Sequence, residues 1–359
     1  MTMIDHVIDV DGHVFETPEM WEEYLEEEFQ PRRPIMVKDN WGKERWMVDG
    51  NMRVRGRGAW NPDSVWEAGC QRPGGYDPAQ RIPDMDSEGV DLAVLYGNMA
   101  LGFSNYPDAK LAGAFCRAYN TWLADYCSYA PERLKGVASL PLQDLPEAER
   151  ELKRCVEELG FRTVQIQTNV NMRNVDSEAY DNIYHYCQDE GVAVGFHFGG
   201  GGAGVDRTVD QYVIAHAFGF TFEGMISTSF VIMTGLLERF PTLRMAILEA
   251  GTGWIPYWME RLDEHYERRR DEVPGLTMAP SEYFRHPNLF FACEADEKML
   301  PYTLSVVGED SIVMATDYPH WDAPFPGAVT GITDRDDISD EQKQKILVDN
   351  ARRYLGIEN

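Results

Sequence analysis

The feature that most constrains this sequence is an alternation of short β-branched runs with longer helical stretches, which continues along the whole chain. Eight runs are predicted strands, at residues 7–11, 90–96, 134–140, 162–167, 192–198, 243–249, 288–294 and 311–317. Predicted helices cover 109–129, 145–159, 177–190, 207–240, 255–270, 297–306 and 339–354. Apolar strands that alternate with helices are typical of a buried parallel sheet in an α/β protein. Eight such units are the number that closes a (β/α)₈ barrel; an open doubly wound sheet is the alternative.

Polar side chains at the carboxyl ends of the predicted strands favour the barrel. They are Asp11, Gln167, His197, Glu249, Glu294 and Asp317. In a (β/α)₈ barrel these ends share one rim, and that rim carries the active site. We therefore predict a single distorted TIM-barrel domain over residues 1–359.

The segment at about 30–81 interrupts this alternation. It is rich in Trp, Arg, Gly and Pro, and its stretch ERWMVDGNMRV has an Asp-Gly pair between two short strand-like runs, which is a hairpin signal. We interpret the segment as an insertion after the first strand that covers the barrel mouth. Its arginines Arg53, Arg55 and Arg57 could bind a substrate carboxylate, although exposure to solvent is the default interpretation.

Composition excludes several classes of function. Lys and Arg total 33 against 60 Asp and Glu, a net charge of −27, which argues against binding to nucleic acid or to anionic membranes. The six cysteines include no CxxC pair and are expected to be reduced. The N-terminus lacks a signal-peptide pattern, and the longest apolar stretch, 225–237, is too short to span a bilayer. We expect a cytoplasmic protein.

The N-terminal octapeptide DVDGHVFE contains the first candidate metal ligands. Residues two apart in a strand point to the same face, so Asp9, Asp11 and His13 are expected to converge. Asp11 and His13 would offer an oxygen and a nitrogen to one cation, and Glu16 in the following loop could add a carboxylate. The alternative is an Asp-Gly turn with an incidental histidine.

Further candidates lie at later strand ends. His197 ends the fifth predicted strand before a glycine run, and Asp317 ends the eighth with His320 three residues later. His216 lies in a predicted helix and is a ligand, a catalytic group or a packed core residue. The alternatives for the others are a histidine bonded to backbone and a helix N-cap. Carboxylates and imidazoles together are the ligand set for Zn, Mn or Fe, so we expect a divalent transition metal, as one or two ions.

Taken together, these motifs resemble the amidohydrolase superfamily, and most closely its amidohydrolase-2 branch, which includes aminocarboxymuconate-semialdehyde and γ-resorcylate decarboxylases. The resemblance rests on Asp11-Gly12-His13, His197, the segment 240–264 and ATDYPH at 315–320, and it extends over nearly the whole chain. It implies a distorted (β/α)₈ barrel with a divalent metal at its C-terminal mouth. Asp11, His13, His197 and Asp317 match the ligand positions of the family.

The chain departs from this pattern at the sixth predicted strand. Decarboxylating relatives have an acid/base histidine before a glycine run there, whereas this chain has Glu249 in LEAGTGW. A metal-ligand role for Glu249 is placed first, and a general base and a cap of the following helix are the alternatives.

Three functions follow from these residues. The first is metal-dependent hydrolysis or decarboxylation of a small carboxylated or aromatic substrate, with Asp317 or Glu249 moving the proton and His216 as a further catalytic candidate. The second is a dinuclear iron or manganese hydroxylase that activates O₂, because four carboxylates and four imidazoles are many for one ion. Those are Asp11, Glu16, Glu249, Asp317, His13, His197, His216 and His320. The third is a non-catalytic subunit. The expected partners are a small-molecule substrate and a second subunit, either in a homo-oligomer such as a dimer or in a hetero-oligomer with a related chain.

Overall fold

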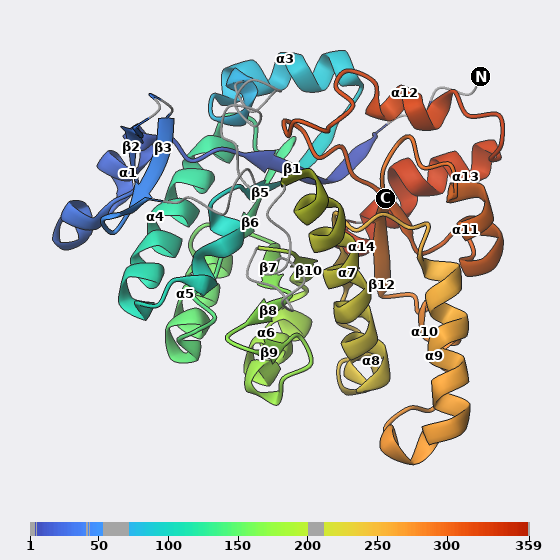
Figure 1. Cartoon of the computed structure of the whole chain (residues 1–359). Coiled ribbons are helices and arrows are strands. Elements are labelled where there is room, and N and C mark those ends of the chain that lie inside the picture. Colours follow the sequence, from blue (N-terminus) through green and yellow to red (C-terminus); the bar gives the residue numbers. More distant parts are fainter. Residues whose placement is uncertain are drawn as a thin grey trace.

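Eight parallel strands form one sheet in the order β1-β5-β6-β7-β10-β11-β12-β13 (Figure 1). This computed structural model describes residues 6–40, 44–52, 72–199 and 212–357, with residues 4 and 42. The strands are β1 (Ile8–Val14), β5 (Leu92–Gly97), β6 (Leu134–Ala138), β7 (Thr163–Gln167), β10 (Ala193–His197), β11 (Met245–Ile247), β12 (Leu289–Cys293) and β13 (Ile312–Met314). Each overlaps one predicted run, so the prediction of eight parallel strands is confirmed.

Helices surround this sheet (Figure 1), and each of the longer ones overlaps a predicted helix except α3 (Pro78–Glu88), which begins within the segment interpreted as an insertion. The longer ones are α3 (Pro78–Glu88), α4 (Ala109–Ser128), α5 (Leu145–Glu157), α6 (Asp181–Glu190), α7 (Tyr212–Met233), α9 (Ile255–Arg269) and α11 (Leu300–Val307). Shorter ones are α1 (Pro18–Tyr24), α8 (Leu236–Arg239), α10 (Pro280–Tyr283), α12 (Ala328–Thr333), α13 (Asp340–Gln344) and α14 (Asn350–Leu355). The predicted helix over 207–240 is divided, because Gly235 adopts φ 73° between α7 and α8. No helix in the described parts of the chain is long and apolar enough to cross a membrane.

Apolar side chains pack in two separate layers. The larger cluster lies between the strands and the surrounding helices. The smaller cluster contains alternate strand residues, such as Val94 and Tyr96, together with Ala351, Tyr354 and Leu355 of α14. We interpret the smaller cluster as the barrel interior, which α14 closes at the amino ends of the strands. The opposite, carboxyl end is left for the candidate site.

The seam between β1 and the end of β13 is closed by a few specific bonds. The backbone N–H of Asp317 donates to the Asp11 carbonyl at 3.0 Å, and the N–H of His13 donates to the Tyr318 carbonyl at 2.7 Å. These bonds lie just beyond the end of β13. The barrel is therefore joined at the two chain segments that carry candidate ligands.

A β-bulge in β1 corrects the prediction that Asp9 converges with Asp11 and His13. Asp9 pairs with Ala93 but Gly12 pairs with Leu95, so β1 has one extra residue here. The extra residue shifts the alternation of side chains, and Asp9 points away from the cavity that Asp11 lines. The expectation for Asp9 was wrong because a bulge depends on the partner strand.

The insertion after the first strand is described in part. β2 (Ile35–Lys38), β3 (Glu44–Val48) and β4 (Asn51–Met52) form a three-stranded antiparallel sheet. Asp49 and Gly50 connect β3 to β4 with φ of 50° and 70°, the two positive values that a type I′ hairpin turn requires. The predicted hairpin is confirmed. Residues 53–71, which include Arg53, Arg55 and Arg57, lie outside the described residues.

Candidate metal centre

Three fully buried side chains meet at the carboxyl ends of β1 and β10. Asp11 Oδ1 lies 3.5 Å from His13 Nε2 and 3.7 Å from His197 Nε2, and each of the three side chains is 0% exposed. Among the described residues, neither oxygen of Asp11 has a hydrogen-bond partner, and the same holds for Nε2 of both histidines. Leaving buried polar atoms unpaired is costly, so this arrangement favours a cation that would bind them.

Both histidines present the nitrogen lone pair that a metal needs. His197 Nδ1 lies 2.8 Å from the Phe198 carbonyl, which only accepts, so Nδ1 carries the hydrogen and Nε2 is free to bind. Burial, with His320 nearby, lowers the pKa of His13 to about 3, so its imidazole is neutral at pH 7. Neutral imidazole is the form that binds metals.

Two further carboxylates approach this group from β11 and β13. Glu249 Oε2 lies 3.2 Å from His197 Nε2, and Asp317 Oδ1 lies 3.2 Å from His13 Nε2. Glu249 and Asp317 have φ of 48° and 54°, in the left-handed region that non-glycine residues seldom adopt. Such strained positions cluster at functional sites. The strand ends are thus bent at the two residues whose carboxylates face the buried histidines.

His320 and Asp317 form a short ion pair. His320 Nδ1 lies 2.6 Å from Asp317 Oδ1. Burial alone would raise the pKa of Asp317, but the charge of His320, its hydrogen bond to Asp317 and the nearby His13 outweigh burial and lower the pKa below its usual range. Burial would likewise lower the pKa of His320, yet the Asp317 carboxylate raises it to about 9. Asp317 is therefore ionised at neutral pH.

The spacing of the donor atoms fits one metal ion. Ligands about 2.0–2.2 Å from a tetrahedral or octahedral ion lie roughly 2.8–3.6 Å from one another. The distances from Asp11 to His13 and from His13 to Asp317 are 3.5 and 3.2 Å, and Asp11 to His197 is only slightly longer at 3.7 Å. The two sets of donors that come together, Asp11-His13-His197 and His13-Glu249-Asp317-His320, share His13. Its Nε2 is the atom measured to both Asp11 and Asp317, and one lone pair binds one ion. The geometry thus supports a single centre, and a dinuclear one is not shown.

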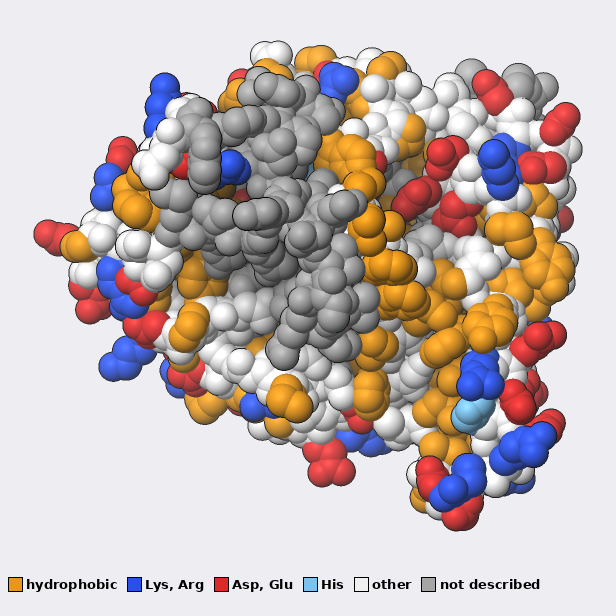
Figure 2. Space-filling view, in the orientation of Figure 1, with side chains coloured by type: hydrophobic (Ala, Val, Ile, Leu, Met, Phe, Trp, Pro, Cys, Tyr) orange, Lys and Arg blue, Asp and Glu red, His pale blue; other side chains and the backbone are white. Residues whose placement is uncertain are grey.

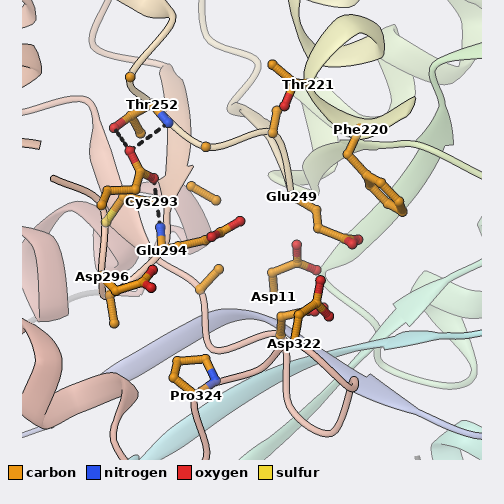
Figure 3. A pocket seen from close by; sticks show the side chains of 18 of the residues that line it. Asp11, Phe220, Thr221, Glu249, Thr252, Cys293, Glu294, Asp296, Asp322 and Pro324 are labelled. Atoms are coloured by element: carbon orange, nitrogen blue, oxygen red, sulfur yellow. Dashed lines mark hydrogen bonds between the residues drawn. The ribbon is translucent and has the colours of Figure 1, made fainter. Parts of the chain in front are cut away.

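A cavity of about 450 Å³ opens beside this cluster. The carboxylates of Asp11, Glu249 and Asp322 converge in it, with Phe220 on one side (Figure 3). Among its described lining residues seven are acidic, and Lys298 is the one lysine or arginine. On the face shown in Figure 2, acidic side chains gather beside a band of hydrophobic ones. The cavity is thus a strongly acidic chamber in contact with the candidate ligands.

Glu249 and Asp11 are the two carboxyl groups in this cavity whose pKa values are raised well above the usual range. Burial raises the pKa of Glu249 well above its usual value, and the negative charge of Asp317 adds to the effect. His216 Nε2 lies 4.0 Å from Glu249 Oε1, and His216 Nδ1 lies 3.8 Å from Asp322. The structure therefore places His216 beside Glu249 and outside the two donor sets. Asp322 was not among the residues predicted from the sequence, although it follows His320 by only two residues.

Glu16 lies apart from the ligands with which the sequence grouped it. Its two oxygens accept hydrogen bonds of 2.9 Å from the backbone N–H groups of Met99 and Ala100, and it is 3% exposed. Glu16 belongs to neither donor set. The metal-ligand interpretation of Glu16 is replaced by a structural one, because its oxygens are already satisfied where the chain leaves β5.

We expect Glu16→Gln to lower stability without loss of metal. Glutamine keeps one oxygen but places an NH₂ group against a buried backbone donor, which should cost about 1–3 kcal/mol of unfolding free energy. Denaturant unfolding and metal analysis of the purified variant test this. A stable variant with reduced metal content would return Glu16 to the ligand set.

The sequence model of the family described as Amidohydrolase matches residues 8–357. The chain is 28% identical over 288 residues to a 2-amino-3-carboxymuconate-6-semialdehyde decarboxylase of Dictyostelium discoideum, with 79% of this chain and 77% of the relative aligned. The crystal structure of an amidohydrolase from Mycobacterium avium subsp. paratuberculosis has a TM-score of 0.81 at 19% identity, covering 99% of this chain and 100% of that one. A dihydroxybenzoic acid decarboxylase from Polaromonas sp., with bound manganese and the inhibitor 2-nitroresorcinol, has a TM-score of 0.71 at 20% identity, covering 98% and 97%. The two structures support the barrel fold.

Proposed function

The chain belongs to the amidohydrolase family, and on that basis we propose that it is a metal-dependent decarboxylase of a small carboxylated aromatic compound. The observation that carries this proposal is the buried group of unpartnered donor atoms on Asp11, His13 and His197, which opens into the acidic cavity. Of the two reactions expected from the sequence, decarboxylation is favoured because the relatives described above include decarboxylases of carboxylated compounds. None of those relatives supports the O₂-activating alternative.

We assign Asp11, His13, His197 and Asp317 as the ligands. A divalent ion bound there would act as a Lewis acid toward a substrate oxygen. Manganese is our first choice, because a structural relative binds it and because the donors are two carboxylates and two imidazoles. His320 would then keep Asp317 ionised and oriented through its 2.6 Å contact.

Glu249 is the residue that we assign as proton donor. In decarboxylation the carbon–carbon bond to the carboxylate breaks, CO₂ leaves, and the ring carbon takes a proton in its place. Burial and the negative charge of Asp317 raise the pKa of Glu249 well above its usual value and favour its protonated form, whereas the pKa of Asp317 is lowered. Burial also raises the pKa of Asp11, but a cation bound to Asp11 would favour its ionised form. Two carboxyl groups with opposite pKa shifts, Glu249 and Asp317, suit the roles of acid and ligand. His216, 4.0 Å from Glu249, would help to return a proton to it.

The charge of the cavity restricts the substrate. Glu294, Asp296 and Asp322 surround the cavity beyond the ligands, so a second carboxylate on the substrate would be repelled there. Phe220 and Trp254 offer apolar surface to an aromatic ring. We therefore propose a monocarboxylated aromatic substrate with hydroxyl or amino groups, which would donate hydrogen bonds to these carboxylates.

We expect removal of metal to abolish activity reversibly and to lower stability. CO₂ release should be assayed on a panel of hydroxy- and aminobenzoic acids before chelation, after dialysis against EDTA, and after addition of Mn²⁺. At a Mn²⁺ concentration 100 times Kd, binding should add about 2.7 kcal/mol to the unfolding free energy, visible as a higher Tm. Turnover that survives complete removal of metal would exclude the proposed function.

Other expectations from the sequence stay predictions. The single domain with an insertion over the barrel mouth, the cytoplasmic location and an oligomeric state are untested by the geometry. Exposed hydrophobic side chains on α7 give oligomerisation a surface to test: Val213, Ile214, Phe218 and Phe222.

A further inference from the structure

We propose that Asp9 and Arg81 form a buried clamp that positions the ligand-bearing ends of β1 and β13. Asp9 is 1% exposed and Arg81 is 1% exposed, although neither side chain enters the cavity. The inference rests on the proposed metal centre but not on the proposed reaction.

Asp9 bonds to both sides of the barrel seam. Its Oδ1 accepts hydrogen bonds from the backbone N–H of Asp11 at 3.1 Å and of Thr316 at 3.0 Å. Its Oδ2 accepts a 2.6 Å hydrogen bond from the Thr316 hydroxyl. Thr316 directly precedes Asp317, and its hydroxyl oxygen also accepts from the Tyr318 N–H at 3.1 Å. One buried carboxylate thus fixes the backbone at one ligand and immediately before another.

Arg81 completes the clamp from α3. Its Nη1 donates a 2.8 Å hydrogen bond to the carbonyl of His13, and its guanidinium lies 4.4 Å from the centre of the Tyr318 ring. Arg81 therefore contacts one residue on each side of the seam. Burial raises the pKa of Asp9 on balance, and the hydrogen bonds from Thr316 and the nearby charge of Arg81 partly offset this rise.

The space at Gly12 shows how tightly the clamp fits. A Cβ at Gly12 would stand 2.7 Å from Arg81 Nη2 and 2.7 Å from Asp9 Oδ2, closer than van der Waals contact allows. The side chains of Asp9 and Arg81 thus occupy the outer side of the bulge between Asp11 and His13. Because of the bulge, Asp9 lies outside the cavity and supports the ligands from the opposite face of β1.

The clamp is tested by metal affinity measured without substrate. Asp9→Asn keeps the size of the side chain but removes the charge opposite Arg81 and replaces one acceptor with a donor. Loss of such support for ligands typically weakens metal binding by about 10–100-fold, and we expect this change in the Mn²⁺ Kd. The Mn²⁺ electron paramagnetic resonance spectrum of the bound ion should change as well, because the ligands are displaced.

Glu151→Gln is the matched control. Glu151 is a 3% exposed carboxylate that pairs with Arg154 at 2.7 Å and bonds to Asn120, between α4 and α5. The Glu151→Gln variant should lose stability as Asp9→Asn does, but it should keep the Mn²⁺ Kd and the Mn²⁺ spectrum of the wild type. Equal Mn²⁺ affinity in Asp9→Asn and wild type would overturn the clamp. A wild-type chain that binds no Mn²⁺ would overturn the metal centre and the clamp together.

A second pair of variants covers the case in which Asp9→Asn does not fold. Arg81→Met removes the other half of the clamp, and Asp9→Asn/Arg81→Met leaves no unpaired buried charge. If the two residues act as one unit, the loss in metal affinity of the double variant should be about equal to the loss in Arg81→Met alone. Wild-type affinity in Arg81→Met would contradict the proposal.

Discussion

Replacing His197 with alanine is expected to reduce turnover by at least about 10³-fold, because the several kcal/mol that a Lewis acid contributes to the transition state would be lost with the ion. His197 offers an Nε2 without a hydrogen-bond partner to the centre. Its Nδ1 bonds to the carbonyl of the next residue, Phe198. The side chain closes no apolar core, so we expect the barrel to stay folded. His13→Ala should behave in the same way.

Metal content, Tm with and without Mn²⁺, and the circular dichroism spectrum of each variant check this result. Wild type should gain stability on addition of Mn²⁺, and the two alanine variants should not. His265→Ala is the control, since His265 bonds to the Arg261 carbonyl on an exposed face of α9. If His197→Ala binds Mn²⁺ as tightly as His265→Ala does, the ligand assignment is wrong.

Glu249→Gln is expected to slow turnover by about 10²–10⁴-fold while metal content stays unchanged, because glutamine has no proton to donate at this position. The pH profile gives a second measure. A donor must be protonated, so wild-type activity should fall as the pH passes above the raised pKa of Glu249. That high-pH limb should be absent from any residual activity of the variant.

The other roles of Glu249 predict different results. A ligand to the ion would lose bound metal in Glu249→Gln, because a neutral amide binds metal less well than a carboxylate. A helix cap would keep both metal and turnover and lose about 1 kcal/mol of stability. Glu88→Gln controls for the loss of a buried carboxylate, since Glu88 accepts the N–H groups of Gly327 and Val329. It should lose stability only.

The residues that the sequence could identify are those whose role depends on local pattern. Each apolar run is buried on both faces, so its composition alone marks it as a strand of a parallel sheet. The carboxyl ends of all barrel strands lie on the rim that carries the active site, whatever the order of the strands. A polar residue at the end of such a run can therefore be recognised as a candidate, and His197, Glu249 and Asp317 were predicted in this way. Asp11 and His13 were predicted for the same reason. The hairpin turn was predicted because two adjacent residues, Asp49 and Gly50, are enough to specify it.

Contacts between distant segments decided the rest. Asp9 was placed on the wrong face because the bulge in β1 exists only against the register of β5. Glu16 was taken for a ligand because the backbone donors at residues 99 and 100 lie more than eighty positions away. Arg81 gave no signal, since it stands at the end of the predicted insertion and a lone arginine is usually exposed, whereas this one is buried by the seam between the first and last strands. Local pattern determined which atoms are offered to the metal, and long-range pairing determined which of them meet, because closing the barrel brings the two ends of the sheet together.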